Sequence, residues 1–251
     1  MNLDNQHIYF LSDFHLGAPN AQASLVREKK IVAFLDSIKH QATSIFLVGD
    51  MFDFWFEYKN VIPKGYARIL GKLAELSDLG IELHFFVGNH DMWMSGYFEQ
   101  EFNMPVYHHP KQFVLNNQSF FIGHGDGLGP HDKGYKFLKK IFRNKVCQFL
   151  FGFLHPYIGI NIANYFSRKS RQKTGSSDAI FLGEDKEWLV QYCKKKLETK
   201  HFDYFIFGHR HLPLDIKLND KSTYINLGDW ITNFTYAVYD GKQVELKKWE
   251  E

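Results

Sequence analysis

Residues 44–53 read Ser-Ile-Phe-Leu-Val-Gly-Asp-Met-Phe-Asp, a short apolar run followed by a glycine and two carboxylates. An apolar run bounded by glycine is typical of a strand that is buried on both faces. The pattern occurs earlier at 7–13, His-Ile-Tyr-Phe-Leu-Ser-Asp, and later at 81–91, Ile-Glu-Leu-His-Phe-Phe-Val-Gly-Asn-His-Asp. The first third of the chain is therefore predicted to contain three buried strands, each ending in a polar loop.

Segments with helical periodicity separate these strands. Apolar residues recur at helical spacing between the first two strands, at Val26, Ile31, Phe34, Leu35 and Ile38. A second helix is expected over 66–79, where Gly80 ends it. Strands that alternate with helices indicate βαβ units.

Further strands are expected in the rest of the chain. Segments 112–115 and 119–122 flank Asn116-Asn117, which favours a hairpin. Apolar runs at 203–207, 214–218, 224–226, 234–239 and 244–249 predict five more strands. The sequence therefore predicts mixed sheets without an internal repeat.

Composition limits the possible classes of protein. The 251 residues are 45% hydrophobic and 23% charged, which fits one large domain or one domain with an insertion. The formal charge is only +2, so the whole chain gives no argument for a nucleic-acid partner. Cys147 and Cys193 lack metal-ligand spacing, and no signal peptide or membrane span is recognised. A cytoplasmic protein is expected.

One segment differs from the rest in charge. Residues 133–173 contain ten Lys and Arg and no Asp or Glu, which leaves 20 basic and 28 acidic residues elsewhere. The segment has helical periodicity and little strand signal, so we expect a helical cap at 133–196 inserted into a core formed by 1–132 and 197–251. Aromatic and aliphatic residues lie between its charges, a composition suited to an anionic amphiphile or membrane surface. Packing within a small helical subdomain, with a solvated basic face, is the alternative.

Five polar clusters follow predicted strands, where the catalytic groups of α/β proteins gather. Carboxylate oxygens and neutral imidazole nitrogens are ligands for Mn, Zn, Fe and related divalent ions, and the adjacent glycines permit sharp turns. A single Asp-x-His would be weak evidence, because a surface turn explains it equally well. The clusters are Asp13-Phe14-His15, Gly49-Asp50-Met51-Phe52-Asp53, Gly88-Asn89-His90-Asp91, Gly123-His124-Gly125-Asp126 and Gly208-His209-Arg210-His211.

As an ordered set, these clusters resemble the binuclear metallophosphoesterase, or calcineurin-like, superfamily. The resemblance covers the chain from Asp13 to His211 and implies an α+β fold, an α/β/β/α arrangement in which a mixed β-sandwich is flanked by helices. It implies two divalent ions, with Mn²⁺ favoured and Zn²⁺, Fe²⁺ or Co²⁺ also possible. It implies that one ion is bound by Asp13, His15, Asp50 and His211, and the other by Asp50, Asn89, His124 and His209.

The chemistry of such a centre follows from its charge. Two cations about 3.5 to 4 Å apart acidify a shared water and stabilise the oxygens of a phosphorus centre during in-line attack. His90 is expected to donate a hydrogen bond to the developing charge or to protonate the leaving oxygen, beside the ligands Asn89 and Asp50. Asp53, Asp91 and Asp126 either orient ligand side chains or form backbone turns.

Residues 49–55 indicate a particular family within this superfamily. Their sequence, Gly-Asp-Met-Phe-Asp-Phe-Trp, is similar to the Gly-Asp-x-Phe-(Glu or Asp)-x-Trp signature of UDP-2,3-diacylglucosamine diphosphatases, which act in lipid A synthesis. This implies hydrolysis of UDP-2,3-diacylglucosamine to UMP and 2,3-diacylglucosamine 1-phosphate (lipid X). It also implies substrate contacts at Asp132, Tyr135, Arg168, Ser170, Arg171 and Lys173.

The chain departs from this family at His90, where the best-known lipid A enzymes have Arg. The identity of the general acid and the exact diphosphate substrate therefore stay open. A general phosphodiesterase or phosphatase and a nuclease are alternative enzymes, although the aliphatic cap and acidic body disfavour nucleic acid. A scaffold without catalysis would not need the complete ligand set. We expect a cytoplasmic enzyme that binds a nucleotide-linked glycolipid and associates peripherally with the anionic cytoplasmic face of the inner membrane.

Overall fold

The computed structural model describes residues 7–129, 133–174 and 180–250, which form two facing sheets. The six-stranded sheet has the order β11-β10-β1-β2-β3-β4, in which β1 to β4 are parallel and the β1–β10 and β10–β11 pairs are antiparallel. Its strands are β1 (His7–Leu11), β2 (Ala42–Val48), β3 (Glu82–Phe86), β4 (Val106–Tyr107), β10 (Thr235–Tyr239) and β11 (Val244–Lys248).

The second sheet has five strands in the order β5-β6-β7-β9-β8. Both sheets are mixed, because β6, β7 and β9 are parallel while β5 and β8 are antiparallel to their neighbours. The strands are β5 (Lys111–Leu115), β6 (Gln118–Gly123), β7 (Tyr204–Phe207), β8 (Pro213–Asn219) and β9 (Ser222–Leu227).

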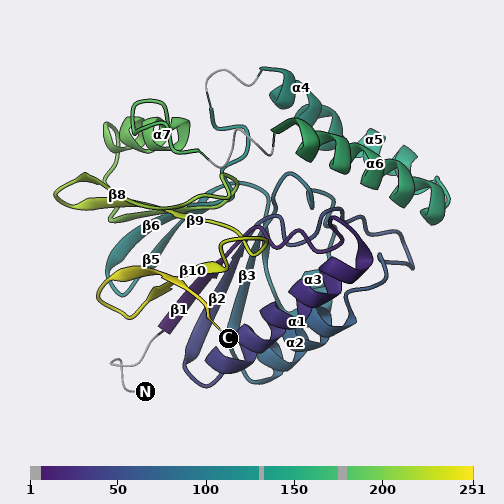
Figure 1. Ribbon diagram of the computed structural model, residues 1–251, viewed down its shortest axis with the longest axis horizontal. Helices are drawn as coiled ribbons and strands as arrows, with labels where there is room; N and C mark the ends of the chain where they lie inside the picture. The colour runs from purple at the N-terminus through teal and green to yellow at the C-terminus, as the bar shows by residue number, and fades with distance from the viewer. Residues whose placement is uncertain (1–6, 130–132, 175–179, 251) are drawn as a thin grey trace.

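Helices cover the outer faces of both sheets. Helices α1 (Ala21–Ile38), α2 (Ala67–Asp78) and α3 (Tyr97–Phe102) cover the six-stranded sheet, and α7 (Trp188–Leu197) lies over the five-stranded sheet (Figure 1). The predicted α/β/β/α sandwich is therefore confirmed.

The alternation of side chains along β1 shows how the sequence forms these layers. Ile8 and Phe10 point between the sheets, whereas Tyr9 and Leu11 join the core beneath the helices. The Phe10 ring stacks on Phe46 of its own sheet at 5.1 Å and on Phe120 of the opposite sheet at 6.1 Å, measured between ring centroids. A strand that is apolar on both faces is what a central strand between two cores requires.

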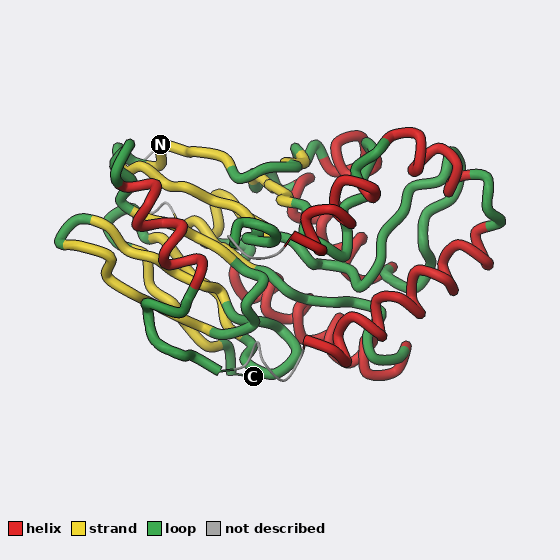
Figure 2. Tube along the Cα trace, turned by 90° about the horizontal axis from the view of Figure 1, so that it is seen from above, coloured by secondary structure: helices red, strands yellow, loops and turns green. Residues whose placement is uncertain are grey.

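Three helices lie outside the sandwich. We refer to α4 (Lys133–Phe142), α5 (Lys145–Gly152) and α6 (Pro156–Thr174) as the cap helices. They lie beyond the ends of the strands in Figure 1, and in Figure 2 most of the helical tube lies toward one end of the molecule and the strands toward the other. The cap helices contact the body through aromatic side chains. The ring centroid of Phe151 lies 4.8 Å from that of Phe56 and 4.7 Å from that of Trp93.

Helix α7 lies within the predicted cap, 133–196, but packs on the body. Its residues Leu189, Val190 and Cys193 are buried in one core cluster with Phe121 and Phe205 of the five-stranded sheet. Helical periodicity shows that a helix has a buried face but does not show which surface covers it.

The Asn116-Asn117 turn has the conformation expected from its sequence. Asn116 and Asn117 adopt φ of 45° and 65° and join β5 to β6 as the predicted hairpin. The sequence analysis missed α3 and β4, which have six and two residues. Elements this short contain too little periodicity to recognise.

Candidate metal centre

The loops that follow β1, β2, β3, β6 and β7 bring the predicted ligands together. The ligand atoms of Asp13, His15 and His211 lie within 4.8 Å of one another, and so do those of Asp50, His124 and His209. The two groups adjoin, because His15 Nε2 is 3.6 Å from Asp50 Oδ2. Residues separated by almost 200 positions thus meet at one edge of the sandwich.

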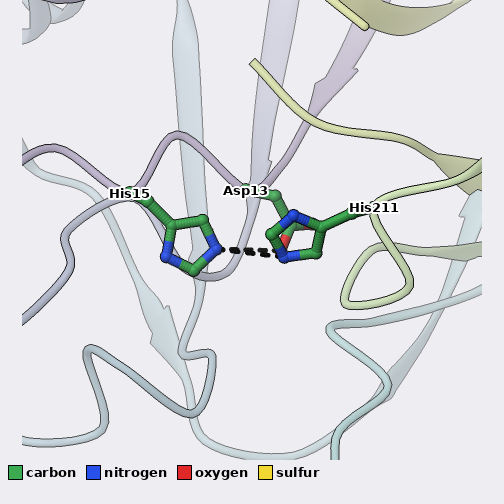
Figure 3. Close-up of side chains that lie close together, drawn as sticks. All are labelled: Asp13, His15 and His211. Atoms are coloured by element: carbon green, nitrogen blue, oxygen red, sulfur yellow. Dashed lines mark hydrogen bonds and ion pairs between the residues drawn. The ribbon is translucent and has the colours of Figure 1, made fainter. Parts of the chain in front are cut away.

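Figure 3 shows the first group. His15 Nε2 and His211 Nε2 face each other at 3.1 Å, and His211 Nε2 lies 3.2 Å from Asp13 Oδ1. Asp13 Oδ1 is buried and has no hydrogen-bond donor of suitable geometry among the described residues. Two facing ring nitrogens beside a buried carboxylate oxygen form a donor set suited to a divalent cation.

The second group is centred on the Asp50 carboxylate. Asp50 Oδ2 lies 3.3 Å from His124 Nε2, which is also 3.3 Å from the amide oxygen of Asn89. The opposite ring nitrogen, His124 Nδ1, lies 2.8 Å from the carbonyl oxygen of Val48, which accepts its proton and leaves Nε2 toward the centre. Asp50 lies between the two groups, where a bridging ligand would have to be.

The electrostatics of the centre favour a cation. Burial raises the pKa of Asp13 and Asp50, but nearby imidazoles outweigh it and hold both carboxyl pKa values well below their usual range. Burial lowers the pKa of His124, yet Asp50 and its neighbouring carboxylates raise that pKa to about 10. Burial and His124 lower the pKa of His209 to about 4. The ionised carboxylates of Asp13 and Asp50 and the neutral imidazole of His209 fit a divalent metal ion, which would take the place of the proton on His124. The centre binds a divalent metal ion.

The backbone of the ligand loops is strained. Asp13, His15 and Asp50 have φ of 57°, 44° and 53°, and His209 and His211 have 71° and 51°. Each such non-glycine conformation costs on the order of 1–3 kcal/mol and persists only where its surroundings fix it. Hydrogen bonds supply this restraint: the amides of Asp13 and His15 donate to the carbonyl oxygens of Gly49 and Asp50 at 3.0 and 2.9 Å.

Gly88 permits two ligand loops to approach closely. A Cβ atom at this position would overlap the Asp50 carboxylate. The amide of His90 donates to Asp50 Oδ1 at 2.8 Å, so the same approach fixes the orientation of that carboxylate. The glycine of the Gly-Asn-His-Asp motif is thus required by space and not by a positive φ, which Gly88 does not adopt.

His90 lies between the centre and the cap helices. Its Nδ1 is 3.0 Å from the carbonyl oxygen of Asp53 and 3.0 Å from the hydroxyl oxygen of Ser167 on α6. Its ring centroid is 4.8 Å from that of His15. Burial lowers the pKa of His90 to about 4, with Asp50 opposing the shift and the surrounding imidazoles adding to it.

The three remaining motif carboxylates have different surroundings. Asp91 accepts backbone N–H bonds from Gly88 at 2.7 Å and Met51 at 2.8 Å, so it joins two ligand loops as a turn residue. Asp53 Oδ1 lies 3.7 Å from Nδ1 of both His15 and His90, beside both rings but beyond hydrogen-bonding distance. Asp126 binds Lys139 of α4 and connects the cap to the body.

The predicted substrate contacts cannot be placed in the same way. Asp132 lies outside the described residues. The others belong to α4 and α6, but their side chains lie outside the described part of the structure: Tyr135, Arg168, Ser170, Arg171 and Lys173.

The sequence analysis missed a polar turn after β9. Asp229 follows Leu227-Gly228 at the end of that strand and lies 3.7 Å, through Oδ2, from His211 Nδ1. The signal was present, because a strand followed by Gly-Asp also marks Asp50. Asp50 is followed by a second carboxylate, Asp53, whereas no other Asp or His lies within three residues of Asp229, so the sequence around Asp229 does not form a cluster.

A mixed sandwich with a carboxylate and imidazole centre at its strand ends defines a metal-dependent phosphoesterase. The model of the calcineurin-like phosphoesterase family matches residues 6–213, and the chain belongs to this family. The predicted superfamily is confirmed.

Two curated relatives are similar over nearly the whole chain. The UDP-2,3-diacylglucosamine hydrolase of Porphyromonas gingivalis is 37% identical over 257 residues, covering 97% of this chain and 98% of the relative. The protein of the same name from Haemophilus influenzae KW20 is 25% identical over 232 residues, covering 91% and 92%. A solution NMR structure from Thermotoga maritima is 14% identical with a TM-score of 0.44 over 97% of this chain and 99% of that one.

Proposed function

We propose that the protein hydrolyses the diphosphate bond of UDP-2,3-diacylglucosamine and releases UMP and 2,3-diacylglucosamine 1-phosphate. The main structural support is the contact between cap and centre, because Ser167 of an apolar, basic cap helix reaches His90 beside the predicted ligands. The names and coverage of the relatives support the same substrate. The metal centre accounts for hydrolysis of a phosphate ester or anhydride. The apolar and basic residues of the cap helices favour a substrate that carries a lipid.

The proposed cofactor is a pair of divalent ions, with Mn²⁺ favoured over Zn²⁺, Fe²⁺ or Co²⁺. When bound, the pair would supply an activated hydroxide and stabilise phosphate oxygens. Asp50 would bridge the ions, since its carboxylate lies between both groups of ligand atoms. We assign one site to Asp13, His15, Asp50 and His211, and the other to Asp50, Asn89, His124 and His209.

His90 is the proposed catalytic imidazole. The Asp53 carbonyl accepts the proton of Nδ1, so Nε2 is the atom left for the substrate. The low pKa of this buried ring keeps it neutral, but an anionic diphosphate beside it would raise that pKa. His90 could then donate to the developing charge or protonate the leaving oxygen.

The cap helices suit acyl chains. A groove of about 530 Å³ runs between α5 and the loops at 56–59 and 93–95, and Phe56, Trp93, Phe149 and Phe153 line it. Each buried methylene of a chain contributes about 0.8 kcal/mol. The predicted contacts Asp132, Tyr135, Arg168, Ser170, Arg171 and Lys173 would bind the sugar and diphosphate.

The outer face of the cap helices would bind the anionic surface of the inner membrane from the cytoplasm. Tyr157 and Phe166 are 74% and 61% exposed, and Lys140, Lys145 and Lys169 are also exposed on the cap helices. Apolar insertion combined with basic residues is the pattern of peripheral membrane binding. Among the described residues no helix has the length and apolarity needed to span a bilayer.

The function is tested by incubating purified protein and Mn²⁺ with UDP-2,3-diacylglucosamine in detergent and analysing the products by mass. We expect UMP, carrying heavy oxygen when the reaction is run in labelled water, because attack is proposed at the phosphorus nearer uridine. Hydrolysis of bis(p-nitrophenyl) phosphate without release of UMP would instead support a general phosphodiesterase. His90, where the lipid A enzymes have Arg, is the observation that favours this alternative.

A further inference from the structure

We infer that the turn at 228–233 positions the metal centre and that the Asp229 carboxylate orients the imidazole of His211. The inference rests on the proposed role of His211 as a metal ligand. Asp229 does not itself face the ligand atoms; it lies behind the ring, 3.7 Å from Nδ1, while Nε2 points toward Asp13 and His15.

The Asp229 carboxylate is fixed in place by its own turn. It is 3% exposed, and its Oδ1 accepts backbone N–H bonds from Ile231, Thr232 and Asn233 at 2.8, 2.6 and 3.1 Å. Its Oδ2 accepts from the Thr232 hydroxyl and the Asn233 amide, both at 3.1 Å. A carboxylate held by this many donors has a fixed orientation, so it can orient a neighbouring ring.

The same turn also holds the backbone of two ligands. The Asn233 side-chain amide donates to the carbonyl oxygen of His211 at 2.9 Å, and the Trp230 amide donates to the carbonyl oxygen of Asp13 at 3.1 Å. Both ligands have positive φ and need external restraint. One turn thus connects a ligand from the start of the chain to one from its end.

The chemical consequence concerns the tautomer of His211. A carboxylate behind Nδ1 favours the proton on that nitrogen and directs the lone pair of Nε2 toward the ion. Loss of such a partner typically weakens metal binding by about 10- to 100-fold. A residue that only formed a turn would have no such effect.

Asp229→Asn keeps the backbone bonds of the turn and changes the atom that faces His211. The asparagine oxygen can still accept the three backbone N–H bonds, but an NH₂ group replaces Oδ2, which faces His211 Nδ1 and accepts from the side chains of Thr232 and Asn233. Asp240→Asn is the matched control, because Asp240 Oδ1 accepts backbone bonds from Lys242 and Gln243, both at 2.8 Å, in the turn between β10 and β11.

The test is a titration of chelator-treated protein with Mn²⁺, in which free Mn²⁺ is measured by electron paramagnetic resonance. We expect Asp229→Asn to weaken binding by about 10- to 100-fold, Asp240→Asn to bind like the wild type, and excess Mn²⁺ to restore turnover. Wild-type Mn²⁺ affinity in Asp229→Asn would overturn the inference.

If Asp229→Asn fails to fold, Asn233→Ala, which removes the bonds to His211 and Asp229 Oδ2, should still weaken Mn²⁺ binding; unchanged affinity would contradict the inference. Weaker Mn²⁺ binding without UMP release by the wild type would leave the positioning role intact and refute only the proposed substrate. A wild type that binds no divalent ion would refute both.

Discussion

The ligand loops and the cap helices differ in almost every physical property. The loops are buried, strained and held by many hydrogen bonds, so that Asp13, His15 and Asp50 each have a defined place. The cap helices expose aromatic residues such as Phe153 and Tyr157 and contact the body through a few rings and polar groups.

This difference indicates a division of labour between the two regions. Transition-state stabilisation requires groups that do not reorganise, which buried loops provide. Selection of a lipid requires accessible apolar surface, which packed loops cannot provide. Substitutions in the loops should therefore affect every substrate, whereas substitutions in the cap helices should affect lipid substrates and membranes.

Asp50→Asn should have the largest effect. It removes the charge at the centre of both ligand groups, so several kcal/mol of charge stabilisation is lost and kcat should fall by about 10⁴-fold or more for all substrates. Metal analysis of the purified variant should show a reduced content. A variant with full metal content and wild-type kcat would contradict the assignment of Asp50.

His90→Gln should lower kcat by about 10²- to 10³-fold, the range for one positioned proton donor. The metal content should stay unchanged, because the predicted ligands remain in place. Steady-state kinetics and metal analysis check both points, with exposed His40→Gln as the control. Wild-type turnover would exclude a catalytic role for His90.

Gly88→Ala should reduce kcat by about 10- to 100-fold, because a Cβ at this position displaces the Asp50 carboxylate. Overpacking should also lower the free energy of unfolding by about 1–3 kcal/mol. Gly71→Ala is the control: its Cβ meets nothing within 4 Å in α2, and it should be neutral or stabilising. Equal kcat and equal unfolding free energy for the two variants would show that neither activity nor stability depends on the close approach of Gly88 to Asp50.

Charge reversal on the cap helices should have the smallest effect on chemistry. Lys140, Lys145 and Lys169 changed to Glu should abolish salt-sensitive sedimentation with vesicles that contain anionic lipid, yet leave kcat on a small phosphodiester within about twofold. Reversal of the exposed body lysines Lys29, Lys64 and Lys242 is the control with the same change in net charge. Failure of the wild type to sediment at low salt would remove the membrane proposal.

The sandwich and the convergence of its ligands could be predicted because short local patterns determine them. An apolar strand such as 44–48 followed by Gly49-Asp50 specifies both a buried strand and the turn that presents a carboxylate. The carboxyl ends of parallel strands lie at a common edge of the sandwich. Ligands distant in sequence, such as Asp13 and His211, could therefore be expected to lie close together.

Other features depend on packing that no local pattern reports. The apolar face of α7 is equally compatible with a helix of the cap and a helix of the body. Its packing against the five-stranded sheet places it in the body. Ser167 contacts His90 because α6 packs beside the metal centre. No sequence motif predicts this packing. Asp229 was missed because its partner His211 lies on another strand end.

The most direct test of the division of labour is kcat/KM for UDP-2,3-diacylglucosamine relative to bis(p-nitrophenyl) phosphate. Phe149→Ser with Phe153→Ser should lower this ratio at least tenfold by loss of lipid binding alone, since a few buried methylenes correspond to more than about 1.4 kcal/mol. Val26→Ser with Val114→Ser, both exposed on the body, should leave it unchanged. A cap variant that loses activity equally on both substrates would contradict the account.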